Sequence, residues 1–356
     1  MKKIFELLDL TIEKRASDLH LIAGAPASLR INGFIEYVDD QKLTPEDVKK
    51  MIYELLKPEQ IEKFEKDQEL DMSYTYLKNN TDKISRFRIN VYNQRNSVAV
   101  ALRFISNDIL GFNELGLPAI IKEVAKKKRG LILVTGATGS GKSTTLATML
   151  DFINNERSGH IITLEDPIEY FHRHKKSIIS QREIGTDSSS FSIALKEAMR
   201  QDPDVILVGE MRDLETIAIA ITAAETGHLV LGTLHTTDAV QTIDRIIDVF
   251  PPYQQQQIRS QLSITLKSVI AQQLLLKADK SGRIPVVEIM IVTPAIQNLI
   301  REAKTYQVYS VIETGKDMGM QTLDHALVYL VSKKTITLDE ALTIARDPDE
   351  LKKKFK

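Results

Sequence analysis

A glycine-rich segment near the middle of the chain carries the residues best suited to chemistry. Residues 131 to 146 read LILVTGATGSGKSTTL, in which Gly136, Gly141, Lys142 and Ser143 satisfy the pattern G-x-x-x-x-G-K-[ST]. In this pattern the glycines let backbone N–H groups approach phosphate oxygens, the lysine neutralises charge, and the serine ligates Mg²⁺. We therefore predict a phosphate-binding loop made of Gly136, Ala137, Thr138, Gly139, Ser140, Gly141, Lys142, Ser143 and Thr144.

The sequence on both sides of this loop predicts the elements that the motif needs. An apolar run before it, residues 131 to 134, is typical of a buried strand, and residues 143 to 149 favour a helix. The N-terminus of that helix would face the phosphates. A chance match in a glycine-rich turn is the alternative, and both flanks count against it.

Composition excludes several classes of protein. The chain has 356 residues, which favours about two domains, and its 47 basic and 48 acidic residues leave a formal net charge of −1. Such a balance offers no overall field to attract nucleic acid or an anionic membrane. No apolar run reaches the roughly 18 residues of a membrane span, so we expect a cytosolic protein. The absence of cysteine excludes disulfides, thiol nucleophiles and cysteine-ligated zinc.

Residues 1 to 106 predict an α+β domain. Residues 17 to 22 resemble a short strand, Asn32-Gly33 lies between apolar flanks as in a hairpin, and Thr44-Pro45 is typical of a helix start. Three strand-like runs follow this helix.

The polar residues of the last two runs include three arginines. Arg86 and Arg88 alternate with apolar residues in the run from Ile84 to Tyr92, and Arg103 lies in the run from Ser97 to Ile105. Arginines on the polar face of a strand are often merely solvated. They become candidates here because a phosphate site requires positive charge.

Residues 107 to 118 have the glycine, proline and asparagine content of a linker, so we place a domain boundary there. From 119 to 356, strand and helix patterns alternate, which predicts an α/β domain with an open, mostly parallel sheet. The expected strands are 160–170, 204–210, 228–235 and 284–292, and the expected helical segments include 189–199, 213–226, 253–277 and 295–302.

Several polar side chains fall at the predicted strand ends, where ligands of open α/β sheets bind. Glu210 ends an apolar strand, the position of a Walker B acid that holds Mg²⁺. Glu165, Asp166 and Glu169 crowd another strand end, and one of them would activate a water molecule for hydrolysis. Position alone does not choose among these three.

Four histidines also lie in or near these predicted strands. His228 and His235 lie at opposite ends of one predicted strand, so at most one can easily lie beside a γ-phosphate. His172 and His174 belong to no metal-ligand pattern, and we interpret them as surface residues.

Taken together, these segments resemble the secretion and pilus-motor ATPases over essentially the whole chain. The matching stretches are SDLHL, RFRIN, TGATGSGKSTT, ITLEDPIEY, LVGEMRDLET, TAAETGHLVLGTLHT and AIQNLIRE. The resemblance implies a PAS-like N-terminal domain, a RecA-like ATPase domain, and a homohexameric ring that binds ATP and Mg²⁺ between neighbouring subunits.

The resemblance also implies roles for individual residues. Glu169 would activate water, Glu210 would take the Walker B position with Mg²⁺, and His228 would lie near the γ-phosphate, with His235 in the same motif. The arginines that would reach ATP, in the same or the adjacent subunit, are Arg86, Arg88 and Arg103.

Two features favour the retraction branch of this family. The stretch AIQNLIRE matches its retraction motif except that Gln297 replaces an arginine, and the chain cannot build the tetracysteine zinc module of assembly and type II secretion relatives. The implied function is a motor that powers type IV pilus retraction from the cytoplasmic face of the inner membrane, through a platform protein of the pilus machinery. No nucleic acid partner is expected.

Other readings stay open at this point. A pilus-assembly or type II secretion ATPase is the nearest alternative. A DNA-translocating motor, a small-molecule kinase and a nucleotide-dependent scaffold without turnover are more distant ones.

Overall fold

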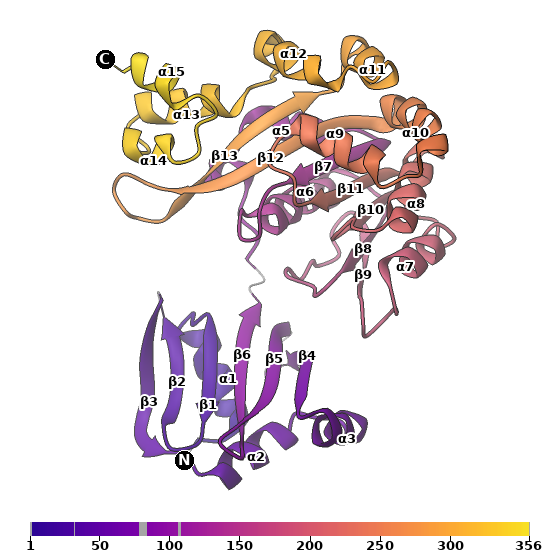
Figure 1. The fold of residues 1–356 in the computed structure, drawn as a ribbon. Coiled ribbons are helices and arrows are strands. Elements are labelled where there is room, and N and C mark those ends of the chain that lie inside the picture. Colours follow the sequence, from indigo (N-terminus) through magenta and orange to yellow (C-terminus); the bar gives the residue numbers. More distant parts are fainter. Residues whose placement is uncertain (1, 32, 78–83, 106–107, 356) are drawn as a thin grey trace. The chain divides into compact units, whose positions relative to one another are not determined.

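A computed structural model describes residues 2–31, 33–77, 84–105 and 108–355 (Figure 1). The chain divides into two compact units. The first comprises Met1–Asp108 with Glu169–Phe171, and the second comprises Ile109–Ile168 with His172–Lys356.

The described residues of the first unit form an antiparallel sheet, in the strand order β3-β2-β1-β6-β5-β4, and three helices. The strands are β1 (Asp18–Ile22), β2 (Pro26–Ile31), β3 (Phe34–Lys42), β4 (Glu69–Leu77), β5 (Ile84–Gln94) and β6 (Ser97–Ile105). The helices are α1 (Ile4–Glu13), α2 (Pro45–Tyr53) and α3 (Pro58–Asp67). The predicted start of α2 is confirmed, since the Thr44 side chain accepts a hydrogen bond from Asp47 N. Strands β2 and β3 pair as expected of a hairpin, although Asn32 lies outside the described residues.

The register of β5 and β6 separates two faces of this sheet. Phe87 pairs with Phe104 and Arg88 pairs with Arg103, while Phe87 is fully buried. Because side chains alternate along a strand, the arginines lie on the face opposite the buried phenylalanine. The alternation predicted for β5 is therefore confirmed.

The second unit contains a mostly parallel sheet, as predicted. The order is β13-β12-β7-β11-β10-β8-β9, and every neighbouring pair is parallel except β12 with β13. Its strands are β7 (Gly130–Thr135), β8 (His160–Glu165), β9 (Ile178–Glu183), β10 (Val205–Val208), β11 (Leu229–Leu234), β12 (Leu266–Leu276) and β13 (Arg283–Ile291).

Helices cover both faces of this sheet, so its central strands are buried throughout (Figure 1). Leu131 and Leu133 of β7 pack into one apolar core, and Ile132 and Val134 pack into another. The α-helices are α4 (Phe112–Leu115), α5 (Ala119–Ala125), α6 (Lys142–Glu156), α7 (Phe191–Ala198), α8 (Leu214–Glu225), α9 (Ala239–Asp248), α10 (Pro252–Thr265), α11 (Pro294–Arg301), α12 (Val308–Thr314), α13 (Leu323–Ser332), α14 (Leu338–Leu342) and α15 (Pro348–Lys353). Two 3₁₀ turns, η1 (Thr305–Gln307) and η2 (Lys316–Met318), complete the described part.

Most of the predicted linker belongs to the second unit, which begins at Ile109. Phe112 of α4 packs edge-on against Phe152 of α6, with ring centroids 5.7 Å apart, and Leu117 is buried in the core beneath. The apolar residues between the glycines and prolines of this segment therefore fix it to α6.

The helical prediction for residues 253 to 277 is wrong in its second half. Helix α10 ends at Thr265, and β12 continues directly from Leu266 with no glycine or proline between them. Buried residues such as Val269, Ile270 and Ala271 form a continuous apolar run, which periodicity alone cannot assign to helix or strand. These residues form a strand because they pair with β7 on one side and β13 on the other.

Across the described residues, no helix combines the length and the apolar character that crossing a membrane would need.

Candidate functional site

The phosphate loop connects the end of β7 to the start of α6. Its glycines have positive φ angles, +141° at Gly136, +79° at Gly139 and +86° at Gly141, a backbone region that other residues rarely adopt. A Cβ atom added at Gly136 would lie 2.2 Å from the carbonyl oxygen of Gln272 on β12. The loop can therefore adopt this path only with glycine at that position.

Lys142 is buried at the first turn of α6, where its side chain turns back over the loop. Its Nζ donates to the carbonyl oxygens of Gly136 at 2.7 Å and Ala137 at 3.0 Å. These contacts hold a positive charge directly above the loop backbone. Ser143 follows on the same turn.

The geometry of the loop fits the phosphates of a nucleotide. A Cβ added at Gly139 would meet no atom within 4 Å, so the space beside the loop is open at that point. Helix α6 is 15 residues long, and its N-terminus presents backbone N–H groups and a positive dipole end to this space. Phosphate oxygens are the ligands that such a cradle accepts.

The protein oxygens needed for Mg²⁺ are also present. Ser143 and Glu210 would hold the ion, and one or two protein ligands suffice when phosphates and water supply the rest. Among the described residues there is no cluster of three or more histidine, aspartate or glutamate side chains that could bind a metal by itself.

Glu210 and His235 form a polar pair at the carboxyl edge of the sheet. Glu210 follows β10 and His235 follows β11, and His235 Nε2 lies 2.7 Å from Glu210 Oε1. Arg212 Nε contacts the same carboxylate oxygen. Because Leu234 of β11 pairs with Thr135 of β7, His235 lies at the same sheet edge as the phosphate loop.

The structure places His228 at the end of β11 away from the phosphate loop, which counts against the predicted position near the γ-phosphate. His228 precedes β11, and its Nδ1 lies 2.9 Å from the carbonyl oxygen of Ala223. Its neighbour Leu229 pairs with Gly130, the first residue of β7, at the edge away from the loop. The six residues of β11 span about 20 Å at roughly 3.3 Å per residue, so His235 is the histidine at the nucleotide end.

The three acids at and after the end of β8 differ in their surroundings. Glu165 ends the strand in the second unit and accepts hydrogen bonds from Thr163 Oγ1 at 2.6 Å and Gln181 Nε2 at 3.2 Å. Asp166 is exposed. Glu169 is also exposed and belongs to the short segment that groups with the first unit, so its role in activating water stays a prediction.

The candidate arginines lie together in the first unit. Arg88 Nε is 3.1 Å from Asp71 Oδ2, and Arg103 Nε is 2.9 Å from Asp18 Oδ1. Arg86 is partly buried on the same strand as Arg88. The approach of these guanidiniums to ATP stays a prediction.

A cavity of about 500 Å³ adjoins the first turn of α6 and was missed from the sequence. Its wall includes Thr144 and Thr145 of α6, Gln272 of β12, and the cations Lys277 and Arg283. The assignment of residues 253 to 277 to helix concealed it, because no local pattern indicates that β12 lies beside the loop.

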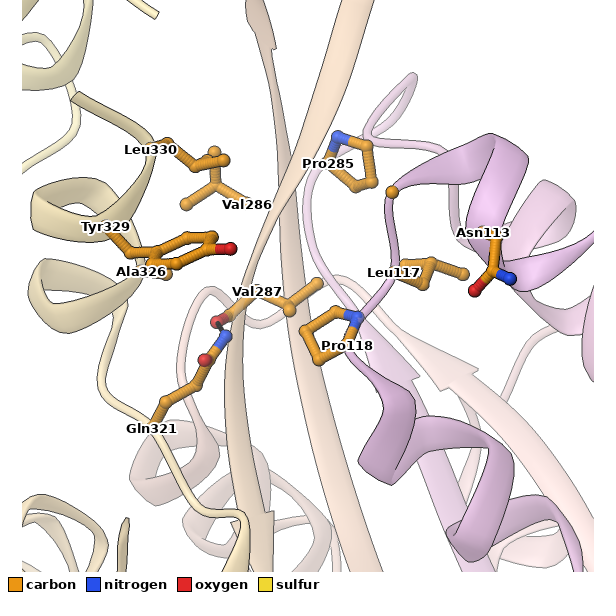
Figure 2. Close-up of a pocket in the computed structure, with 11 residues that line it drawn as sticks. Asn113, Leu117, Pro118, Pro285, Val286, Val287, Gln321, Ala326, Tyr329 and Leu330 are labelled. Atoms are coloured by element: carbon orange, nitrogen blue, oxygen red, sulfur yellow. Dashed lines mark hydrogen bonds between the residues drawn. The ribbon is translucent and has the colours of Figure 1, made fainter. Parts of the chain in front are cut away.

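A separate cavity of about 450 Å³ lies between β13 and α13. In Figure 2, Tyr329 and Leu330 of α13 face Val286 and Val287 of β13, with Pro118 nearby. The described residues that line it carry no charge, so this cavity is unsuited to a triphosphate.

His172 is buried, contrary to the prediction that it is a surface residue. Only 5% of the residue is exposed, and burial lowers the pKa of its imidazole to about 4. Its backbone N–H donates to Gln181 Oε1 at 2.8 Å, and Asp151 lies near enough to act on its imidazole, contacts that the local sequence does not reveal.

Comparison with known proteins agrees with this site. The fold, the phosphate loop and the acid at the end of β10 define a P-loop ATPase. A family model described as "Type II/IV secretion system protein" matches residues 2–343, and the chain belongs to this family.

Within the family the chain is similar to pilus retraction motors. It is 49% identical to the "Type IV pilus retractation ATPase PilT" of Pseudomonas aeruginosa, over 97% of this chain and 99% of that protein. It is 45% identical to a "Twitching motility protein" of Neisseria gonorrhoeae, over 93% and 87% of the two chains. A crystal structure of the pilus retraction motor PilT with bound ADP matches with a TM-score of 0.91 at 49% identity, over 99% of this chain and 100% of that one.

Proposed function

We propose that this chain is an ATP-hydrolysing motor that powers the retraction of type IV pili. The observation that carries the proposal is the full-length similarity to PilT, at 49% identity over 97% of this chain. Similarity restricted to the ATPase domain would not distinguish a retraction motor from an assembly motor.

In the proposed reaction the loop binds the nucleotide by its phosphates. Backbone N–H groups of the loop and Lys142 Nζ would contact phosphate oxygens, and Ser143 with Glu210 would hold Mg²⁺, which would neutralise phosphate charge. His235 orients the Glu210 carboxylate. Glu169 accepts a proton from the attacking water.

Assembly would complete the site. We propose a homohexameric ring in which arginines of the first unit, Arg86, Arg88 and Arg103, approach the nucleotide of the same or the next subunit. An arginine supplied in trans raises the rate of comparable reactions by roughly 10³ to 10⁵, or about 4 to 7 kcal/mol. Hydrolysis would then require ring closure, and release of phosphate would relax the grip between domains.

The proposed location follows from the proposed task. The motor would act in the cytoplasm at the inner membrane and bind it through a platform protein of the pilus machinery. The arginines Arg86, Arg88 and Arg103 of the first unit would bind ATP, and the motor would not bind nucleic acid.

The motif AIQNLIRE forms α11, in which Ile296 and Ile300 are buried and Gln297 is half-buried. The apolar side of the motif is thus an internal packing surface. Because Gln297 is uncharged, α11 cannot perform a function that requires a charge at position 297.

One experiment tests the function as a whole. The gene is expressed in two strains of a twitching bacterium, one lacking its retraction ATPase and one lacking its assembly ATPase, with Lys142→Ala as the inactive control. Rescue of twitching only in the retraction-deficient strain is expected. Rescue of piliation in the assembly-deficient strain would instead identify an assembly ATPase.

A second experiment tests the ring. ATPase rate and particle mass are measured against protein concentration, and activity should appear with the hexamer. Mixing Lys142→Ala and Arg88→Ala subunits should restore part of the activity if Arg88 acts across the interface. Full ATPase activity in a monomer would refute the proposal that neighbouring subunits share the ATP site.

A further inference from the structure

Gln272 lies on β12 at the point where the phosphate loop leaves β7. Its neighbour Ala271 pairs with Thr135, the last residue of β7, so Gln272 stands beside the first residue of the loop. Only 2% of Gln272 is exposed. A glutamine this buried must satisfy both ends of its amide within the protein.

Both ends of the amide contact the phosphate-loop segment. Gln272 Nε2 donates to the carbonyl oxygen of Ser140 at 2.8 Å, and Gln272 Oε1 accepts from the hydroxyl of Thr145 at 2.7 Å. The Ser140 carbonyl can only accept, so it must face the NH₂ group, and Thr145 must then donate. The orientation of the amide is therefore fixed by its two partners.

The loop also packs directly on this residue. A Cβ at Gly136 would lie 2.2 Å from the carbonyl oxygen of Gln272, and a Cβ at Gly141 would lie 2.8 Å from Gln272 Nε2. Two motif glycines are thus required, in part, because Gln272 occupies the space that a side chain would need.

The contact with Ser140 has a consequence for phosphate binding. The peptide unit between Ser140 and Gly141 is planar and trans, so its C=O and N–H bonds point in opposite directions. When Gln272 holds the Ser140 carbonyl on the β12 side, the N–H of Gly141 must point away from β12. Gly141 N–H is one of the groups that this motif directs at phosphate oxygens.

We propose that Gln272 is a positioning residue of the nucleotide site: its amide aligns the Ser140–Gly141 peptide and the start of α6 so that the loop N–H groups converge on the phosphates. This inference rests on the proposed function, since it concerns the same site. It assigns to β12 a task in nucleotide binding as well as in the sheet.

Three variants test it. Gln272→Met keeps the length of the side chain and removes both hydrogen bonds, Gln272→Glu replaces the donor with a carboxylate that repels the Ser140 carbonyl, and Thr145→Val removes a single bond. Gln273→Met, on the next residue of the same strand, is the matched control. Affinity for ADP with Mg²⁺ is measured by calorimetry, together with kcat and KM for ATP.

The expected order is set by the number of lost and repulsive contacts. Gln272→Met should weaken ADP binding by about 10- to 100-fold and Thr145→Val by about 3- to 10-fold, because one neutral hydrogen bond is worth roughly three- to tenfold in an equilibrium. Gln272→Glu should bind ADP more weakly than Gln272→Met does. The loss should appear as a raised KM with a smaller change in kcat, and the double variant Gln272→Met with Thr145→Val should be no worse than Gln272→Met alone.

A purely structural role for Gln272 predicts another pattern. In that case Gln272→Met would have a lower melting temperature but an ADP affinity within twofold of wild type. This result would overturn the inference. If Gln272→Met does not fold, Thr145→Val decides by the same criterion. Failure of the wild-type protein to hydrolyse ATP would refute the proposed function, whereas the ADP titration would still test Gln272.

Discussion

The imidazole of His235 lies 2.7 Å from the carboxylate of Glu210, and this contact joins the ends of β11 and β10 at the edge of the sheet where the phosphate loop begins. His228, at the other end of β11, instead contacts the backbone of Ala223. Two histidines that stand seven positions apart in the sequence therefore lie at opposite ends of one strand and contact different groups.

The first prediction contrasts these histidines. His235→Asn should lower kcat about 100-fold, because a group that orients the Walker B carboxylate in the transition state is lost. His228→Asn should change kcat less than about twofold, as expected of a substitution away from the site. Steady-state ATPase rates of both variants test this prediction. Equal losses of kcat would mean that the position of each histidine along β11 does not determine its contribution to catalysis.

The second prediction separates binding from turnover. Lys142→Ala should abolish tight ATP binding, because the loop loses the charge that lies 2.7 Å from its Gly136 carbonyl. Glu169→Gln should bind ATP normally and stop turnover, since the amide cannot accept the proton of water. Glu165→Gln is the matched control for a neighbouring acid. Should Glu165→Gln stop turnover while Glu169→Gln does not, Glu165 takes the role of base.

The third prediction concerns the open side of the loop. Gly139→Ala should fold, at a cost of about 1 to 2 kcal/mol for its φ of +79°, and should weaken ADP binding because relief of this strain would move the backbone N–H groups of the loop. Gly185→Ala is the control, with a φ of +86° and equally open surroundings outside the loop. Calorimetric ADP titrations should separate them; similar affinities would show that the cradle does not hold phosphate.

Local patterns were sufficient for part of this molecule. The run from β7 through the loop into α6 was predicted because strand, glycine positions and helix follow each other directly in the chain. The alternation of Phe87 with Arg86 and Arg88 identified the buried face of β5 for the same reason, since a period of two is a local property of a strand.

Contacts between distant segments account for what the sequence did not reveal. Gln272 and Thr145 are 127 positions apart, and only the pairing of β12 with β7 brings them together. The choice between His228 and His235 required the direction of β11 relative to β7. The consecutive apolar residues Val269, Ile270 and Ala271 also break the alternation that would distinguish β12 from a helix.

The last prediction concerns pH. Burial lowers the pKa of His172 to about 4, from an ordinary value of 6.5, so the folded protein keeps this imidazole neutral while the unfolded chain protonates it. Its contribution to stability is present above pH 6.5 and is lost as the pH falls toward 4. By linkage, the free energy of unfolding should be about 2 kcal/mol lower at pH 5 than at pH 8 on account of this group.

Urea unfolding at the two pH values measures this difference. Other titrating groups also contribute, so the informative quantity is the change between wild type and His172→Leu, in which about 2 kcal/mol of the pH dependence should disappear. His174→Leu is the control, because His174 is exposed and lies two positions away. An unchanged pH dependence in His172→Leu would mean that His172 is protonated as readily in the folded protein as in the unfolded chain.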